Sequence, residues 1–155
     1  MALGMQSIAR TLGVEWRGLF AEVLGVMKDW APTTLPTERD YQGSLVSYLR
    51  EKFPGARVDP EYRHNGTTAD LMLSWSGIFT GTHRVYFELK RNLTRKAEFD
   101  RLVGQIEDLK PSDNSVVVVL CGQCDPQYVE RLRERYAEST GGLFGHATAI
   151  VEKQA

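Results

Sequence analysis

The stretch VYFELKRN, Val85 to Asn92, places an acid and a base on one face of an otherwise apolar strand. At the two-residue period of a strand, one side is apolar and the other carries Glu88 and Lys90. The apolar side consists of Val85, Phe87 and Leu89, and Tyr86 precedes the acid on the other side. Removing a carboxylate and an ammonium from water is costly unless each finds a partner. The stretch therefore indicates a chemical site, and the alternative is a solvent-facing charge pair on an edge strand.

A second strand repeats the pattern with Asp70. In TTADLMLSW, residues 67–75, the two-residue period separates two faces. One face has Ala69, Leu71, Leu73 and Trp75, and the other has Asp70, Met72 and Ser74. If the two strands pair as a hairpin, Asp70 and Glu88 lie within a few ångströms. Such carboxylates raise each other's pKa unless a cation lies between them. Mg²⁺ suits this arrangement, because it binds through one or two carboxylates and keeps several waters. The alternative for Asp70 is a cap on the preceding turn.

The remaining elements surround these strands in a definite order. Helical spacing predicts a helix over 6–30, divided by Gly13, and a second one over 38–53 with Thr37 as N-cap. Strands are expected at 56–63, 67–75 and 83–91, then a helix over 95–110, a buried strand at 115–120, a helix over 125–138 and a strand at 146–152. This order predicts an α/β fold, with a mixed central sheet flanked by helices on both faces.

Two helical residues point toward the same place. Glu38 lies on the buried stripe of the 38–53 helix, whereas Glu51 points away from that stripe. Gln105 lies at the margin of the apolar stripe of the 95–110 helix. Both Glu38 and Gln105 can therefore reach the sheet face that carries Asp70. The alternatives are a dipole-favoured acid in a first helical turn and an ordinary surface glutamine.

Together these residues resemble the PD-(D/E)XK nuclease superfamily, whose fold is restriction-endonuclease-like. The residues that carry the resemblance are Glu38, Asp70, Glu88-Leu89-Lys90 and a helical Gln105. The αβββαβ core of that fold matches residues 37–120, with Ala69 in place of the signature proline. The resemblance implies a single nuclease-like domain over 1–155, in which 1–36 is a helical extension with its connector and 37–155 is the core.

The resemblance also implies a role for each signature residue. Asp70 and Glu88 would hold Mg²⁺, or Mn²⁺ as a substitute, with the Leu89 carbonyl as a third ligand. Lys90 would orient or activate the attacking water. Glu38 would support the metal site, and Gln105 would help to position it. The expected activity is metal-dependent hydrolysis of DNA phosphodiester bonds.

Cations near the signature predict how a nucleic acid would be held. They are Arg91, Arg95 and Lys96 after the third strand, and Arg63 and His64 before Asp70. Phosphate contacts from such residues give affinity without reading sequence, so structure-selective or nonspecific cutting is expected. RNA and branched junctions remain alternative substrates. A non-catalytic nucleic-acid- or protein-binding module on the same fold is the rival interpretation, and a solvated helix start is the alternative for the cations.

Composition sets limits on class and location. The chain has 155 residues, a formal net charge of -1 and two cysteines, which suits one globular domain without a disulfide scaffold. The first residues do not resemble a secretory signal, so a cytoplasmic location is expected. The CGQC stretch, Cys121 to Cys124, is more simply a buried strand end than a redox or zinc motif. The N-terminal helix is expected to pack on the core, with a homodimer interface as the alternative.

Overall fold

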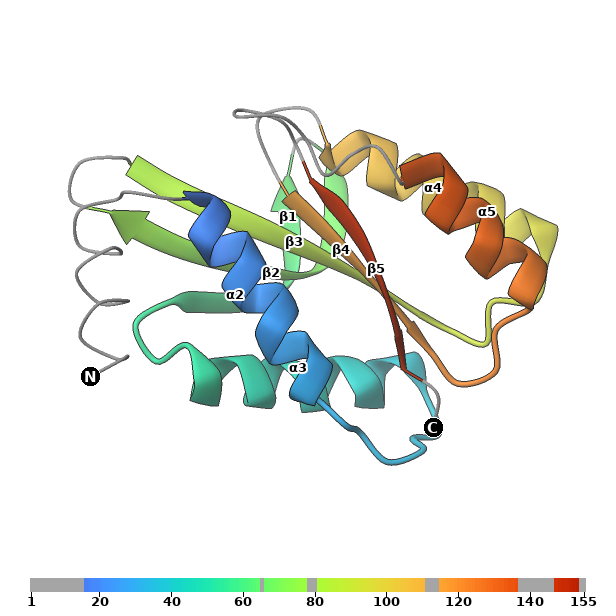
Figure 1. Cartoon of the computed structure of the whole chain (residues 1–155), viewed down its shortest axis with the longest axis horizontal. Coiled ribbons are helices and arrows are strands. Elements are labelled where there is room, and N and C mark those ends of the chain that lie inside the picture. Colours follow the sequence, from blue (N-terminus) through green and yellow to red (C-terminus); the bar gives the residue numbers. More distant parts are fainter. Residues whose placement is uncertain (1–15, 65, 78–80, 111–114, 137–146, 154–155) are drawn as a thin grey trace.

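Figure 1 shows a computed structural model, which describes residues 16–64, 66–77, 81–110, 115–136 and 147–153. One five-stranded sheet forms its centre, in the order β1-β2-β3-β4-β5. The strands are β1 (Arg57–His64), β2 (Thr67–Gly77), β3 (Gly81–Arg91), β4 (Ser115–Cys121) and β5 (Thr148–Lys153). The helices are α2 (Trp16–Asp29), α3 (Glu38–Lys52), α4 (Lys96–Leu109) and α5 (Pro126–Tyr136).

The sheet is mixed, as the order of elements predicts. β1, β2 and β3 form an antiparallel meander, and β3, β4 and β5 run parallel. The parallel strands need helical crossovers, which α4 and α5 supply. β4 is buried along its whole length, in accordance with its unbroken run of β-branched residues. The α/β class, the mixed sheet and the αβββαβ order from α3 to β4 are confirmed.

Two apolar cores cover the two faces of the sheet. In Figure 1, α2 and α3 lie on one side and α4 and α5 on the other. The α3 side packs on β-strand residues such as Leu71, Phe87 and Val117, and the α4 side packs on Met72, Tyr86 and Val118. Helix α2 buries its own apolar stripe in the α3-side core, which confirms its role as a packing element. No described helix is long and apolar enough to span a membrane. The homodimer interface stays a prediction, and residues 1–15 of the extension lie outside the described residues.

Helix α3 begins where its cap predicts. Thr37 and Asp40 form a capping box, in which the Thr37 hydroxyl accepts from the Asp40 backbone N–H and the Asp40 carboxylate accepts from the Thr37 N–H. Tyr41 fixes the preceding connector, because its hydroxyl accepts a hydrogen bond from the Leu35 backbone N–H at 3.0 Å. This start matters for function, since Glu38 is the first residue of the helix.

The face of Ala69 differs from the prediction. Ala69 packs with Met72 in the α4-side core, whereas Leu71 packs in the α3-side core. The alternation therefore breaks at Asp70. The recorded pairing of β1 with β2 also skips one position here, between Pro60–Leu71 and Tyr62–Ala69. The residue at the skipped position of β1, Glu61, has φ of +53°, a conformation that a non-glycine residue adopts only at a cost of about 1–3 kcal/mol.

The loop after β3 is joined to the loop after β4 by side chains. The Asn92 side-chain oxygen accepts from the Gln123 backbone N–H at 2.9 Å, and Cys124 Sγ accepts from the Leu93 N–H at 3.4 Å. Gly122 has φ of +72° and passes directly against Asn92. The CGQC stretch thus has a structural use. Cys121 ends β4 in the core, and burial raises the pKa of its thiol to about 12, which disfavours the reactive thiolate.

Replacing Gly122 with alanine should destabilise the fold. An alanine at this position would have to keep a positive φ, which is unfavourable for a residue with a side chain. Its Cβ would also collide with the Asn92 side-chain oxygen. We expect a loss of about 1–3 kcal/mol in the free energy of unfolding, measured by urea denaturation. Gly104→Ala is the matched control, because a Cβ there meets open space in α4 and should stabilise the helix by about 0.5–1 kcal/mol. Equal effects of the two substitutions would contradict this account of Gly122.

Candidate functional site

The site lies where β2 and β3 stop pairing. The recorded β2–β3 pairs run from Gly77–Gly81 to Leu71–Phe87, so Asp70 and Glu88 come immediately after the last pair. The Asp70 carboxylate then accepts a hydrogen bond from the Leu89 backbone N–H at 2.7 Å. A side chain thus satisfies a backbone donor beyond the end of the ladder. This contact brings the carboxylates of the two strands together, as the hairpin register predicts.

Gln42 of α3 holds the other side of Asp70. Its side-chain amide donates to the Asp70 backbone carbonyl at 2.5 Å. The sequence analysis missed Gln42, although a signal was present. Gln42 lies four residues after Glu38, and residues four apart share one face of a helix. Because Glu38 was predicted to face the sheet, the same spacing predicts that Gln42 also faces the sheet.

Glu88 is the most deeply buried charged residue among those described. It is 1% exposed, and its Oε1 atom finds no hydrogen-bond partner among the described residues. Burial, and after it the charge of the nearby Asp70 carboxylate, raise the pKa of Glu88 to about 9. Burial also raises the pKa of Asp70, while the Leu89 N–H and Lys90 oppose that rise. Without a cation, the pair therefore holds a proton at neutral pH.

Lys90 and Glu38 complete the group at the end of β3. The Lys90 ammonium lies 3.6 Å from Glu38 Oε2, which also accepts the Arg91 backbone N–H at 3.0 Å. The Glu38 side chain is 41% exposed and that of Lys90 is 22% exposed, so this edge of the site meets solvent. These contacts join helix α3 to the end of strand β3. Glu38 and Lys90 therefore lie at the same strand end as Asp70 and Glu88.

The donor set fits a small divalent cation held partly by water. No three His, Cys, Asp or Glu side chains among the described residues form a ready-made metal site. Two carboxylates do face one another, and one buried oxygen of Glu88 has no partner in the described protein. An unpaired buried oxygen of this kind is what Mg²⁺ would satisfy, while waters supply most of its remaining ligands. Glu38 already accepts from Arg91 and contacts Lys90, so its part as a direct ligand stays a prediction.

The other predicted residues lie at different distances from this group. Gln105 is half-buried on α4 beside the buried Ile106, with no recorded hydrogen bond to the acids. Arg91 is partly engaged in structure, because its Nε donates to the Leu35 carbonyl at 3.2 Å. Arg95 is exposed at the N-cap of α4, and Lys96 pairs with the Asp100 carboxylate on the same helix.

The two cations predicted before Asp70 lie at the far end of β1. Arg63 is exposed, and the His64 ring lies 5.4 Å from the Tyr86 ring. Glu51 is exposed on α3, in agreement with its predicted direction. A zinc site at CGQC would need further ligands, and the one histidine later in the sequence, His146, lies outside the described residues.

Similarity between this chain and known proteins is low. No protein-family model matches the chain, and no curated protein matches it. Among solved structures, the chain is similar to a crystal structure of a repair endonuclease from Pyrococcus abyssi, with 14% sequence identity and a TM-score of 0.45. The similarity covers 80% of this chain, which spans 50% of that one. At this level of likeness the site has to be interpreted from its own geometry.

Replacing Glu88 with glutamine should change how stability depends on pH in metal-free buffer. The pKa of Glu88 in the folded protein, about 9, lies above its ordinary value of 4.5. Between these values the folded state binds more protons than the unfolded state, so stability falls as pH rises. From pH 6 to about 8.5 the wild type should lose up to about 3 kcal/mol more than Glu88→Gln.

Urea denaturation in the presence of a chelator would measure this difference. Glu51→Gln is the matched control, because Glu51 is exposed on α3 and should leave the wild-type pH profile unchanged. If wild type and Glu88→Gln lose stability equally over this range, Glu88 does not titrate as described.

Proposed function

We propose that this protein is a metal-dependent nuclease that hydrolyses DNA phosphodiester bonds. The observation that carries the proposal is the contact between the buried Glu88 carboxylate and the half-buried Asp70 carboxylate, with Lys90 at the same strand end. Burying two like charges is unfavourable, so their placement favours a cation site over a structural one. A divalent cation bound there would supply Lewis-acid stabilisation of the charge on the phosphoryl oxygens.

The protein's own groups would divide the remaining work. Asp70 and Glu88 would hold the cation after giving up the proton that they share in its absence. The Leu89 N–H fixes the direction of the Asp70 carboxylate, and Gln42 fixes its backbone. Such fixed orientation matters because a misplaced ligand loses much of its effect on the reaction.

Lys90 would act on the water or on the phosphate. Its ammonium can donate to the attacking water or to a non-bridging phosphate oxygen, and either contact stabilises the charge that develops in the reaction. Glu38, 3.6 Å away, would hold that ammonium in place. Gln105 would help to position the site from α4. Two exposed cations, Arg63 on β1 and Arg95 at the start of α4, would bind phosphates without reading sequence.

A nicking assay on supercoiled plasmid tests the proposal. With Mg²⁺ or Mn²⁺, Asp70→Asn and Glu88→Gln should each lower the nicking rate by about 100-fold or more, because each removes a charge that the cation needs. Lys90→Gln should lower the rate by about 100-fold while leaving Mg²⁺ binding by calorimetry nearly intact.

Glu38 and Glu51 provide a matched pair for the same assay. Both are glutamates of α3, but only Glu38 reaches β3. Glu38→Gln should slow nicking, and Glu51→Gln should not. If the wild type binds no divalent cation and leaves plasmid, RNA and branched DNA intact, the protein is a binding module and the nuclease proposal fails.

A further inference from the structure

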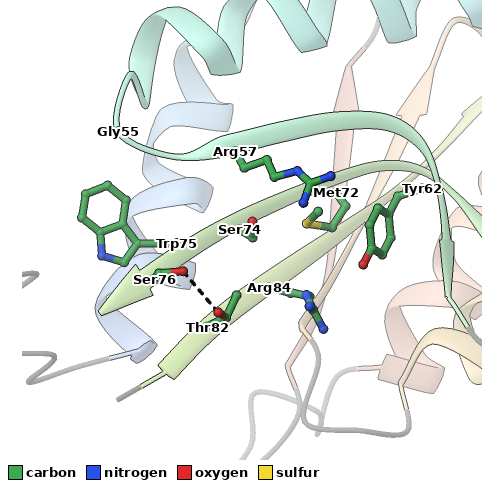
Figure 2. A pocket seen from close by; sticks show the side chains of 9 residues that line it. All are labelled: Gly55, Arg57, Tyr62, Met72, Ser74, Trp75, Ser76, Thr82 and Arg84. Atoms are coloured by element: carbon green, nitrogen blue, oxygen red, sulfur yellow. Dashed lines mark hydrogen bonds between the residues drawn. The ribbon is translucent and has the colours of Figure 1, made fainter. Parts of the chain in front are cut away.

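A groove over β1, β2 and β3 lies on the same sheet face as Glu88, away from the residues discussed above. Its volume is about 330 Å³. Figure 2 shows the residues that line it, which include Arg57 and Tyr62 from β1, Ser74 and Ser76 from β2, and Thr82 and Arg84 from β3. Most of these side chains are polar, and two are cationic. The sequence analysis assigned a role to none of them.

The strand register places the two arginines of the groove, Arg57 and Arg84, in one row across the strands. Arg57 pairs with Ser74 across β1 and β2, and Ser74 pairs with Arg84 across β2 and β3. Neighbouring strands are about 4.8 Å apart, so the Cα atoms of the two arginines lie about 10 Å apart with a serine hydroxyl between them. Long, forked guanidinium groups at that separation can both reach one phosphate group.

The charge of the groove favours an anion. Arg84 is exposed and, within the part of the chain that the structure describes, forms no ion pair with a carboxylate. Arg57 is 69% exposed and contacts the Asp59 carboxylate through Nε, which leaves its two terminal nitrogens for other partners. Ser76 and Thr82 add two exposed hydroxyls, 3.2 Å apart (Figure 2). The groove therefore combines donors with an excess of positive charge.

The row of arginines is in line with the acidic site. Along β3, Arg84, Tyr86 and Glu88 follow one another on the same face, and along β2 the chain runs from Ser74 through Met72 to Asp70. Four residues of strand separate Arg84 from Glu88 by about 13 Å. Tyr86 is fully buried between them, and the Tyr62 ring lies 6.1 Å from it and the His64 ring 5.4 Å from it. These two half-buried rings form an aromatic surface from the groove toward the site.

We propose that this groove binds the single-stranded part of a DNA substrate next to the bond that is cut. Arg84 and Arg57 would hold a backbone phosphate, and Tyr62 would stack on a base. Stacking needs a base face that is free of its neighbours, which a closed duplex does not offer. At the 3.4 Å spacing of a stacked strand, the groove would hold a phosphate about four nucleotides from the cut. The inference rests on the proposed nuclease function and names its substrate class.

Binding measured by fluorescence anisotropy, with a chelator present to prevent cleavage, tests the proposal. The probes are a single-stranded oligonucleotide, a blunt duplex, and duplexes with overhangs of increasing length. The wild type should bind the overhangs more tightly than the blunt duplex, with affinity rising up to about four unpaired nucleotides. Arg84→Gln should weaken binding of unpaired probes about 10-fold and lower the salt dependence by about one phosphate contact. Tyr62→Leu should weaken the same probes about 10-fold with no change in salt dependence.

Arg101→Gln is the matched control, because Arg101 is exposed on α4 and lies outside the groove. Its binding should equal that of the wild type. Equal effects of Arg84→Gln and Arg101→Gln would overturn the proposal, as would an equal loss on the blunt duplex. A deoxynucleoside monophosphate that competes as well as the oligonucleotide would also overturn it, since the groove would then be a small-molecule site.

The two proposals fail separately. If the wild type nicks DNA but Arg84→Gln binds every probe normally, the nuclease stands without the groove. If Arg84→Gln weakens binding of unpaired strands but the wild type cuts nothing with Mg²⁺ or Mn²⁺, the groove stands as a single-strand site on a non-catalytic module. Thermal melting of each variant confirms its folding, and the exposed Arg84 should leave the melting temperature unchanged.

Discussion

The placement of a buried and a half-buried carboxylate at one point of the sheet is the constraint on which the rest of the structure depends. Asp70 and Glu88 lie where strands β2 and β3 separate, and the protein surrounds them with apolar side chains on both faces of the sheet. Burial raises the pKa of both carboxylates, and the charge of Asp70 contributes to the rise at Glu88. A fold that only needed stability would place an apolar pair there, because removing carboxylates from water costs free energy that apolar side chains do not cost.

The surrounding contacts compensate for the separation of the strands. Leu89 has no pairing partner on β2, and its backbone N–H donates to the Asp70 carboxylate instead. The Asp70 backbone carbonyl accepts from the Gln42 side-chain amide. On the outer side, Glu61 adopts a positive φ at the position that the β1–β2 register skips. The irregular backbone therefore includes neighbouring positions on three strands, which are Glu61 on β1, Asp70 on β2 and Glu88 on β3. Its common effect is to direct the Asp70 carboxylate toward β3 without leaving the neighbouring backbone groups unsatisfied.

Helix α3 connects the site to the edge of the molecule. Its capping box fixes where the helix begins, and its first residue, Glu38, reaches the backbone and lysine at the end of β3. One turn later, Gln42 reaches Asp70. On the α4 side of the sheet, the buried Tyr86 lies between Glu88 and the exposed Arg84 along β3. The same strand spacing that pairs Asp70 with Glu88 also aligns the arginines of the groove.

The sequence by itself determined most of the elements, their order and most of the candidate site. Periodicity is a local property, so the alternation in β2 and β3, the Thr37 cap and the stripe of α3 could be recognised without coordinates. These signals were enough to bring Asp70, Glu88, Lys90 and Glu38 together. Only the tertiary structure decided the face of Ala69 and the cationic row of Arg57 and Arg84. Each depends on strand register or on a break in alternation, and both arise from pairing between segments that are distant in sequence.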